Sequence, residues 1–348
     1  MTVLVTGGAG FIGSHVVDLL VGSGHRVRVL DVLAGPDVGS RGVQGNEGAE
    51  YVSGDLRDAD VVERAVTGVE AVVHHAGMVG LGRHFGDVTD YVSHNDIGTA
   101  VLLSALYRCG FSGRLVLASS MVVYGEGCYE CPRHGTLRPG PRARGALQIG
   151  RFDPTCSRCD LALVPRPVTE DAPGDPRNVY AATKLHQEHL CNAFGRESGA
   201  SVIALRYHNV YGPRMPRDTL YAGVAGIFRS ALERGEPPRV TEDGRQLRDF
   251  VHVRDVARAN ADALAAPDSA AGPYNIASGI PLSVGELAAA LARSFGPQAP
   301  DPVVTGDYRL GDVRHVFASP AKAGAALGWQ AEVSLETGLK ELVPARVR

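Results

Sequence analysis

A glycine-rich segment near the N-terminus constrains the fold of this chain more than any other feature. Val3-Leu4-Val5-Thr6 is a short apolar run, and Gly7-Gly8-Ala9-Gly10-Phe11-Ile12-Gly13 follows it directly. Apolar residues from Val16 to Leu20 then recur with a helical period. A strand, a glycine turn and a helix in this order favour a dinucleotide-binding unit over an ordinary turn.

Each of the three spaced glycines has its own use in such a unit. Gly7 allows the tight turn, Gly10 lets the backbone approach a pyrophosphate, and Gly13 lets the helix pack close to the sheet. The free N–H groups around Phe11 and Ile12 lie at the positive end of the helix and suit phosphate. The segment therefore predicts a dinucleotide site.

Further along the chain, the residues that follow expected strands predict which dinucleotide binds. The strand Arg26–Asp31 ends in a carboxylate 18 residues after Gly13, which suits two ribose hydroxyls and repels a 2′-phosphate. NAD is therefore expected rather than NADP. Asp55-Leu56 follows the next strand and is expected at the adenine end, and His75-Ala76 ends another buried strand beside the cofactor.

Tyr180 and Lys184 are the candidate catalytic pair. A spacing of four places both side chains on one face of a helix. The lysine ammonium is then expected to lower the pKa of the phenol, which takes a proton from a sugar hydroxyl while a nicotinamide removes the hydride. The spacing alone is also typical of a solvated helix face, so its weight comes from the dinucleotide signature.

Several ordered segments give the chain its family resemblance. They are Gly7 to Gly13, Asn95 to Thr99, Leu117 to Gly125, Tyr180 to Lys184, Leu205 to Pro213, Arg248 to Val253 and Arg309 to His315. With them the chain resembles the extended short-chain dehydrogenase/reductase family, in its nucleotide-sugar epimerase and dehydratase branch. The resemblance implies an α/β fold, a Rossmann-type doubly wound parallel sheet with a smaller, mostly C-terminal substrate domain.

The same resemblance implies roles for single residues. Ser120 binds the reacting sugar oxygen, Tyr180 exchanges its proton, and Lys184 binds the nicotinamide ribose. Substrate contacts are implied for Ser119, Met121 and Asn209, and Arg248 and Arg309 resemble the arginines that grip the substrate diphosphate. A guanidinium suits that task because it makes paired, charge-assisted contacts with phosphate oxygens, although an arginine at either position also fits a surface ion pair.

One departure from the family pattern favours one chemistry. Dehydratases of this branch carry an acid pair directly after the serine or threonine, and this chain has Met121 and Val122 there. Neither side chain transfers protons. The expected reaction is therefore epimerisation of a nucleotide sugar at C4 through a transient 4-keto sugar. The alternatives are a net nucleotide-sugar reductase or dehydrogenase and, in another class, a zinc-ribbon binding protein on an inactive scaffold.

An insert with four cysteines interrupts the resemblance. Cys128 and Cys131 are separated by 24 residues from Cys156 and Cys159. Two Cys-x-x-Cys pairs at this separation predict a closed, structural four-thiolate zinc site, with His134 a loop residue. Disulfides and redox catalysis are the alternatives. The insert resembles one found in epimerases of 6-deoxyhexose nucleotides such as dTDP-L-rhamnose, and is expected to form a lid, a wall or a subunit contact.

The expected organisation is a cofactor domain and a substrate domain. The first covers residues 1–207 and carries the insert at 126–168, and the second covers 208–348, with 251–277 returning to the cofactor domain. A net charge of −3 without charge runs predicts no nucleic-acid or membrane partner. Without room for a signal peptide before the first strand, the protein is expected in the cytoplasm, and the family resemblance implies a homodimer.

Overall fold

A seven-stranded parallel sheet forms the centre of the computed structural model, which describes residues 1–32, 45–80, 84–217 and 223–343. The strand order is β3-β2-β1-β4-β5-β9-β13. These strands are β1 (Thr2–Thr6), β2 (Arg26–Asp31), β3 (Ala49–Ser53), β4 (Ala71–His74), β5 (Arg114–Ser120), β9 (Ser201–Tyr207) and β13 (Gly272–Ile276). The expected Rossmann-type α/β fold is therefore confirmed.

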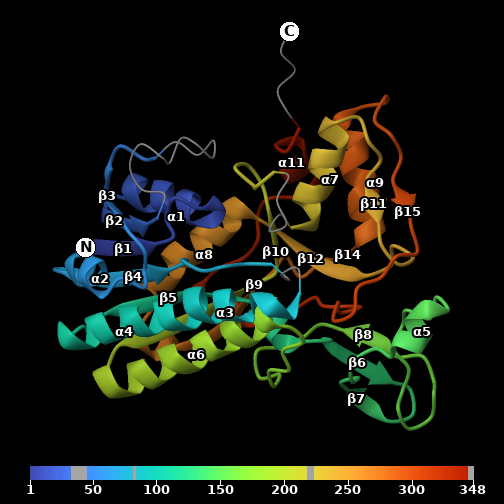
Figure 1. Ribbon diagram of the computed structural model, residues 1–348, viewed down its shortest axis with the longest axis horizontal. Coiled ribbons are helices and arrows are strands. Elements are labelled where there is room, and N and C mark those ends of the chain that lie inside the picture. The colour runs from blue at the N-terminus through green and yellow to red at the C-terminus, as the bar shows by residue number, and fades with distance from the viewer. Residues whose placement is uncertain (33–44, 81–83, 218–222, 344–348) are drawn as a thin grey trace.

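Alternation along each strand sends side chains into two separate cores. Val3 and Val5 of β1 pack on one side with Val16 and Leu20, whereas Leu4 packs on the other side with Leu102. Both faces of a parallel sheet are covered by helices, which is why its strands are almost continuously apolar. Figure 1 shows the two helical layers above and below the sheet.

The helices divide between these layers. One layer contains α1 (Phe11–Gly22), α8 (Val253–Ala265) and α10 (Ala321–Leu327). The other contains α2 (Ala59–Val66), α4 (Gly98–Arg108) and α6 (Val179–Ser198), with the short α3 (Val88–Tyr91) packed against α6. Among the described residues, no helix has the length and apolar character needed to cross a bilayer.

A second core lies at the C-terminal side, at the upper right of Figure 1. Its strands are β10 (Asn209–Tyr211), β12 (Leu247–His252) and β14 (Pro281–Ser283), together with the pair β11 (Arg239–Val240) and β15 (Val303–Val304). Its helices are α7 (Val224–Glu233), α9 (Val284–Phe295) and α11 (Leu335–Lys340). Between β12 and β14 the chain returns to the first core, because α8 packs on α1 and β13 pairs with β9.

The insert forms a small unit of its own at the lower right of Figure 1. It contains β6 (Cys128–Cys131), β7 (Gly135–Leu137), α5 (Arg144–Gln148) and β8 (Val164–Arg166), with strand order β7-β6-β8. Its core has few residues: Tyr129, Cys131, Cys156 and Leu163 are buried, and Leu137 and Cys159 pack against them. So small an apolar core needs a further stabilising element.

Candidate active site and metal centre

The glycine turn between β1 and α1 is built so tightly that side chains are excluded. Gly7 has φ +72°, and a Cβ there would lie 2.6 Å from the backbone nitrogen of Ala76. A Cβ on Gly13 would lie 2.2 Å from the carbonyl oxygen of Gly7. Gly10 faces only the Gly7 oxygen, at 3.2 Å. The turn leaves room for another group to approach its backbone.

The start of α1 is suited to bind an anion. Gly10 precedes the helix and has no side chain to cap it, so the first N–H groups of α1 stay free for a phosphate. Asp31 ends β2, and its carboxylate accepts a hydrogen bond from the backbone N–H of Ala9 at 3.0 Å. The carboxylate is thereby fixed beside the turn, where ribose hydroxyls are expected.

The other residues expected at the cofactor already use their side chains in contacts within the protein. Asp55 forms a two-pronged ion pair with Arg57, which lowers the pKa of the Asp55 carboxyl to about 2, chiefly through that hydrogen-bonded contact. Leu56 is buried in the core. The imidazole of His75 contacts Asn260 at 3.1 Å and stacks on Tyr207, so only its backbone remains near the turn.

Ser120, Tyr180 and Lys184 meet at the carboxyl end of the sheet. Ser120 is the last residue of β5, and α6 begins one residue before Tyr180, capped by the Asn178 side chain. The Lys184 ammonium donates a hydrogen bond to the carbonyl oxygen of Ala118 at 2.9 Å. The three expected catalytic side chains therefore come from two adjacent elements.

The expected lowering of the Tyr180 pKa is outweighed by burial. Burial raises the pKa of Tyr180 to about 12, against a smaller lowering by its hydrogen bond with Ser120. The Lys184 ammonium points towards the Ala118 carbonyl of β5. Burial also lowers the pKa of Lys184 to about 8, although Cys191, Glu188 and Asp96 oppose the change.

Ser119 does not contact substrate as expected, because its hydroxyl donates a hydrogen bond to Glu188 inside the protein. Neighbouring residues of a strand point to opposite faces, so Ser119 faces α6 while Ser120 ends the strand. Glu188 also binds Arg206 of β9 through both carboxylate oxygens, at 2.9 and 2.8 Å. Met121 packs on the apolar cluster around Val123 rather than on charged groups.

Asn95 supports the catalytic helix, a role the sequence did not reveal. It lies in a π-helical segment, Val92–Ile97, and is completely buried. Its amide exchanges two hydrogen bonds with the backbone of Met78 and donates a third to Thr183 at 2.9 Å. Asn95 thus joins the loop after β4 to the turn of α6 that carries Lys184, and such π-helical irregularities are common at functional sites.

Two of the three residues expected at the substrate diphosphate lie near each other in the fold. Asn209 and Arg248 belong to β10 and β12, which pair in parallel, and the Asn209 side-chain oxygen is buried without a partner. Arg248 donates to the carbonyls of Leu247, Val313 and Arg314. Arg309 is exposed and lies in a turn just before Val313 and Arg314.

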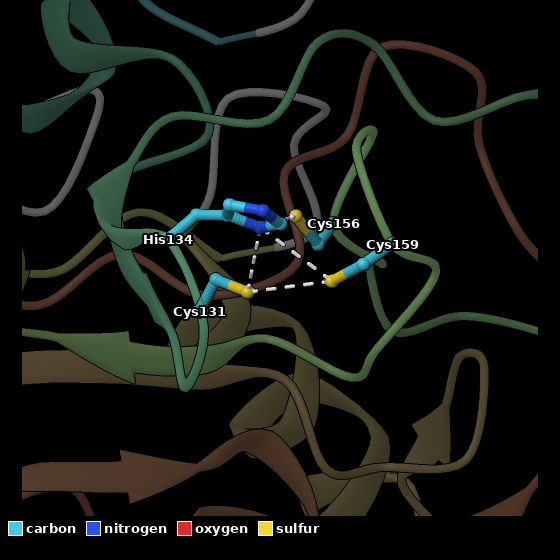
Figure 2. Close-up of side chains that lie close together, drawn as sticks. All are labelled: Cys131, His134, Cys156 and Cys159. Atoms are coloured by element: carbon cyan, nitrogen blue, oxygen red, sulfur yellow. Dashed lines mark hydrogen bonds between the residues drawn. The ribbon is translucent and has the colours of Figure 1, made fainter.

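The insert brings together four groups that could hold a metal ion, as Figure 2 shows. They are Cys131, His134, Cys156 and Cys159, and their ligand atoms all lie within 4.8 Å of one another. The Sγ atoms of Cys131 and Cys159 are 3.7 Å apart, and the His134 Nδ1 lies 3.3 Å from the Cys156 Sγ. Tetrahedral zinc with Zn–S bonds of about 2.3 Å would separate sulfurs by roughly this amount.

The structure thus places His134, rather than Cys128, beside the other three cysteines of the predicted four-cysteine set. Cys128 and Cys131 are three residues apart in the strand β6, so their side chains point to opposite faces. Cys128 packs with the cluster of Val123 and Tyr124 instead. His134 takes its place, because the chain turns after Cys131 with a hydrogen bond from the His134 N–H to the Cys131 carbonyl. The Pro132 after Cys131 was the signal that the strand ends there.

Comparison with known proteins identifies the family. The sequence profile of the NAD dependent epimerase/dehydratase family matches residues 3–144 and 159–277. The chain belongs to this family. The profile skips residues 145–158, which lie inside the insert.

Individual relatives cover nearly the whole chain. A dTDP-L-rhamnose 4-epimerase of Burkholderia thailandensis is 34% identical over 98% of this chain and 93% of its own length. The crystal structure of a UDP-glucose 4-epimerase of Thermotoga maritima with UDP-glucose superposes with a TM-score of 0.79, at 31% identity over 98% of this chain and 97% of the other. A Thermus thermophilus UDP-glucose 4-epimerase complexed with NAD gives a TM-score of 0.78 at 31% identity, with the same coverage of both chains.

The lowered pKa of Lys184 leads to a prediction about pH. Because the folded pKa of about 8 lies below the ordinary 10.5, the unfolded chain binds more protons between these values, and the burial of Lys184 destabilises the fold most below pH 8. We expect side-chain nitrogen NMR of the cofactor-free protein, with the signal assigned by Lys184→Met, to show deprotonation of Lys184 near pH 8. A midpoint close to 10.5 would contradict this.

Proposed function

We propose that this protein is an NAD-dependent epimerase that inverts C4 of a nucleoside-diphosphate sugar through a transient 4-keto sugar. The observation that carries the proposal is the meeting of Ser120, Tyr180 and Lys184 at the sheet edge next to an anion-binding glycine turn. The named relatives, which span almost the whole chain, support this choice of reaction.

The glycine turn fits NAD. Side chains are excluded at Gly7 and Gly13, because a Cβ there would clash with backbone atoms. The uncapped N-terminus of α1 therefore remains open to the pyrophosphate. Asp31, fixed beside the turn, suits the adenosine ribose. Bound NAD supplies the oxidation and the return reduction at C4. Because the same cofactor is restored in each turnover, no net NADH accumulates.

The proton chemistry falls to Ser120 and Tyr180. Tyr180 is protonated at neutral pH, since burial raises its pKa to about 12. To accept the proton of the C4 hydroxyl it needs a nearby cation, and Lys184 lies one helical turn away on the same helix. The Ser120 hydroxyl, in hydrogen-bond contact with the phenol, orients the sugar oxygen and relays its proton.

We propose a nucleotide-linked 6-deoxyhexose as the sugar. The Burkholderia relative acts on dTDP-L-rhamnose, and it matches this chain along 98% of its length, insert included. Met121, beside Ser120, packs with apolar neighbours and offers no hydrogen-bonding group to a sugar hydroxyl. An apolar wall suits a methyl group better than a hydroxymethyl group.

Incubation with four nucleotide sugars tests the reaction and the substrate. We expect dTDP-L-rhamnose to be converted to its C4 epimer without added NAD, with weaker or no turnover of UDP-glucose, UDP-N-acetylglucosamine and UDP-glucuronic acid, as followed by NMR. Tyr180→Phe should lower kcat by about 10²–10⁴-fold because it removes the proton-transfer group, while NAD stays bound. Tyr107→Phe, an exposed phenol of α4, is the control.

Other outcomes of this experiment separate the alternatives. NADH formed in proportion to product would identify a dehydrogenase or reductase. Inversion at a carbon other than C4 would refute the assigned position, and equal turnover of all four sugars would refute the 6-deoxyhexose preference.

We further propose that the four-residue cluster holds a structural zinc ion. Three thiolates and one imidazole form a closed tetrahedral set, which leaves no open position for substrate. The small core of the insert supports the proposal, since a metal would bind Cys131 of β6 to the turn that carries Cys156 and Cys159. All six cysteines are free, as thiol ligands in a reducing cytoplasm would be.

Metal analysis of single variants distinguishes this ligand set from four cysteines. We expect about one zinc ion per chain in the wild type and in Cys128→Ser, and loss of zinc in Cys156→Ser and His134→Ala, because only the latter two remove a ligand. Loss of zinc from Cys128→Ser with retention in His134→Ala would reverse the assignment. A metal-free wild type would refute the site.

We also propose a homodimer through α4 and α6. The two helices pack side by side on one face of the sheet, and α4 and the residue before it expose Tyr107 and Ile97 by 59% and 50%. Ala100 and Ser104 of α4 line a shallow groove that Ala59 of α2 borders on the other side, and a second copy would fill this groove. Exposed apolar surface of this kind is typical of protein interfaces.

Sedimentation measurements test the dimer. Ala100→Arg should convert the protein to a monomer, because a long charged side chain would enter the groove. Ile280→Arg, which changes an exposed residue of the second core, should sediment as the wild type does. Identical sedimentation of both variants and the wild type would contradict the proposed interface.

A further inference from the structure

Residues 312–316 form an extended segment that lies between the insert and β12. On the β12 side, the Val316 N–H donates to the carbonyl of Leu247 at 3.0 Å, and Val316 forms a parallel bridge with Arg248. On the insert side, a Cβ at Gly127 would lie 2.5 Å from the carbonyl oxygen of His315. The segment therefore has direct backbone contact with both units.

Arg248 depends on this segment for its position. Three of the five N–H donors of a guanidinium are used here by backbone carbonyls, and two of these carbonyls belong to Val313 and Arg314, at 2.7 and 2.9 Å. Among the described residues, no carboxylate forms an ion pair with Arg248. Two of its N–H donors thus remain for an anionic ligand, although the more distant carboxylates of Asp312 and Glu126 also stabilise its charge.

Arg314 anchors the segment from within. Its side chain is completely buried and binds three carboxylates: Asp153 of the insert at 2.7 Å, and Glu242 and Asp243 of the second core at 2.8 and 2.7 Å. The pKa of Asp153 falls well below its usual range through its contacts with His315 and Arg314. A buried guanidinium with several charged partners holds one geometry, because losing a partner leaves charge uncompensated.

The insert adds three further contacts to the same segment. The Arg142 guanidinium pairs with Glu242 at 2.7 Å and donates to the Asp312 carbonyl at 2.8 Å. The Arg314 backbone N–H donates to the carboxylate of Glu126 at 2.6 Å, and the His315 N–H donates to the Tyr129 hydroxyl at 3.2 Å. The insert therefore holds backbone atoms at three positions of the segment, Asp312, Arg314 and His315.

The proposed metal ligands are close in the insert to the residues that make these contacts. Tyr129 and Cys131 share one face of β6, and both belong to the small core that contains Cys156 and Leu163. Asp153 lies three residues before Cys156. The cluster thus fixes the two parts of the insert that reach residues 314 and 315.

We propose that the insert positions Arg248 for the substrate diphosphate by holding residues 312–316 in place. Arg142, Asp153 and Arg314 are positioning residues in this arrangement, and Arg248 touches the ligand. The proposal rests on the proposed function, in which Arg248 binds the diphosphate. It replaces the expectation that the insert is a lid or a wall over the sugar.

This role of the insert should affect binding of the diphosphate and leave the proton transfer at Ser120 and Tyr180 unchanged. Ser120 and Tyr180 belong to β5 and α6, and none of the contacts described above involves either residue. Loosening residues 312–316 should therefore weaken the grip on the phosphate farther from the nucleoside. It should not change the turnover of substrate that has bound.

The test uses the zinc-loaded holoenzyme and a variant that removes two links, Arg142→Met with Asp153→Ala. We expect its Kd for dTDP, measured by calorimetry, to rise about tenfold, because small displacements of a binding group have effects of this size. Its Kd for dTMP, which lacks the second phosphate, should stay within about twofold, as should kcat, while KM rises with the dTDP Kd. Arg166→Met, which breaks only the exposed Arg166–Glu130 pair of the insert, is the matched control.

Combination with Arg248→Met completes the experiment. Arg248→Met alone should weaken dTDP, and adding the two insert substitutions to it should change the dTDP Kd by less than about twofold, since their effect passes through Arg248. Three outcomes would overturn the proposal. They are an equal rise of the Kd for dTDP and for dTMP, a Kd for dTDP in the combined variant that reflects both effects multiplied together, and an unchanged Kd for dTDP in the insert variant. If Arg248→Met leaves dTDP binding unchanged, the assigned role of Arg248 fails first.

Discussion

The candidate active site depends on one buried ion pair. Glu188 of α6 and Arg206 of β9 bind each other through two contacts, and Glu188 also accepts a hydrogen bond from the Ser119 hydroxyl. This fixes α6 against β5 and β9, the two strands that end beside Tyr180 and Lys184. A buried pair contributes little net stability compared with apolar packing, but removing one partner is strongly destabilising. Its role here is therefore to specify how the catalytic helix is placed rather than to add stability.

Further polar side chains connect α6 and β9 to neighbouring elements on both sides. Arg206 also donates to the Tyr124 hydroxyl, which in turn donates to Asn275 of β13. On the other side, Asn95 joins the loop after β4 to Thr183 of α6. Of the candidate catalytic groups, Lys184 is buried and Tyr180 is partly buried, and burial shifts the pKa upward for Tyr180 and downward for Lys184. Such shifts are expected where a rigid polar frame holds ionisable groups away from water.

Two separate frames therefore serve the two ends of the proposed substrate. The contacts around Glu188 place the groups proposed to act on the sugar, whereas the contacts around Arg314 place the arginine proposed for the diphosphate. The second frame is shared between the insert and the second core, and it is the part of the molecule in which this chain departs most from its family pattern.

The sequence by itself determined the parallel sheet, the glycine turn and the pair of Tyr180 and Lys184, because these depend on local periodicity and short spacings, whereas Ser120 was assigned by family resemblance. Only the tertiary structure decided that His134 joins Cys131, Cys156 and Cys159 in the candidate metal-binding group while Cys128 packs elsewhere, since strand alternation and a turn after Cys131 act there together. Tertiary structure also turned Ser119 to Glu188 and aimed Lys184 at Ala118. The Arg314 network joins residues up to 188 positions apart, and no local pattern encodes such contacts.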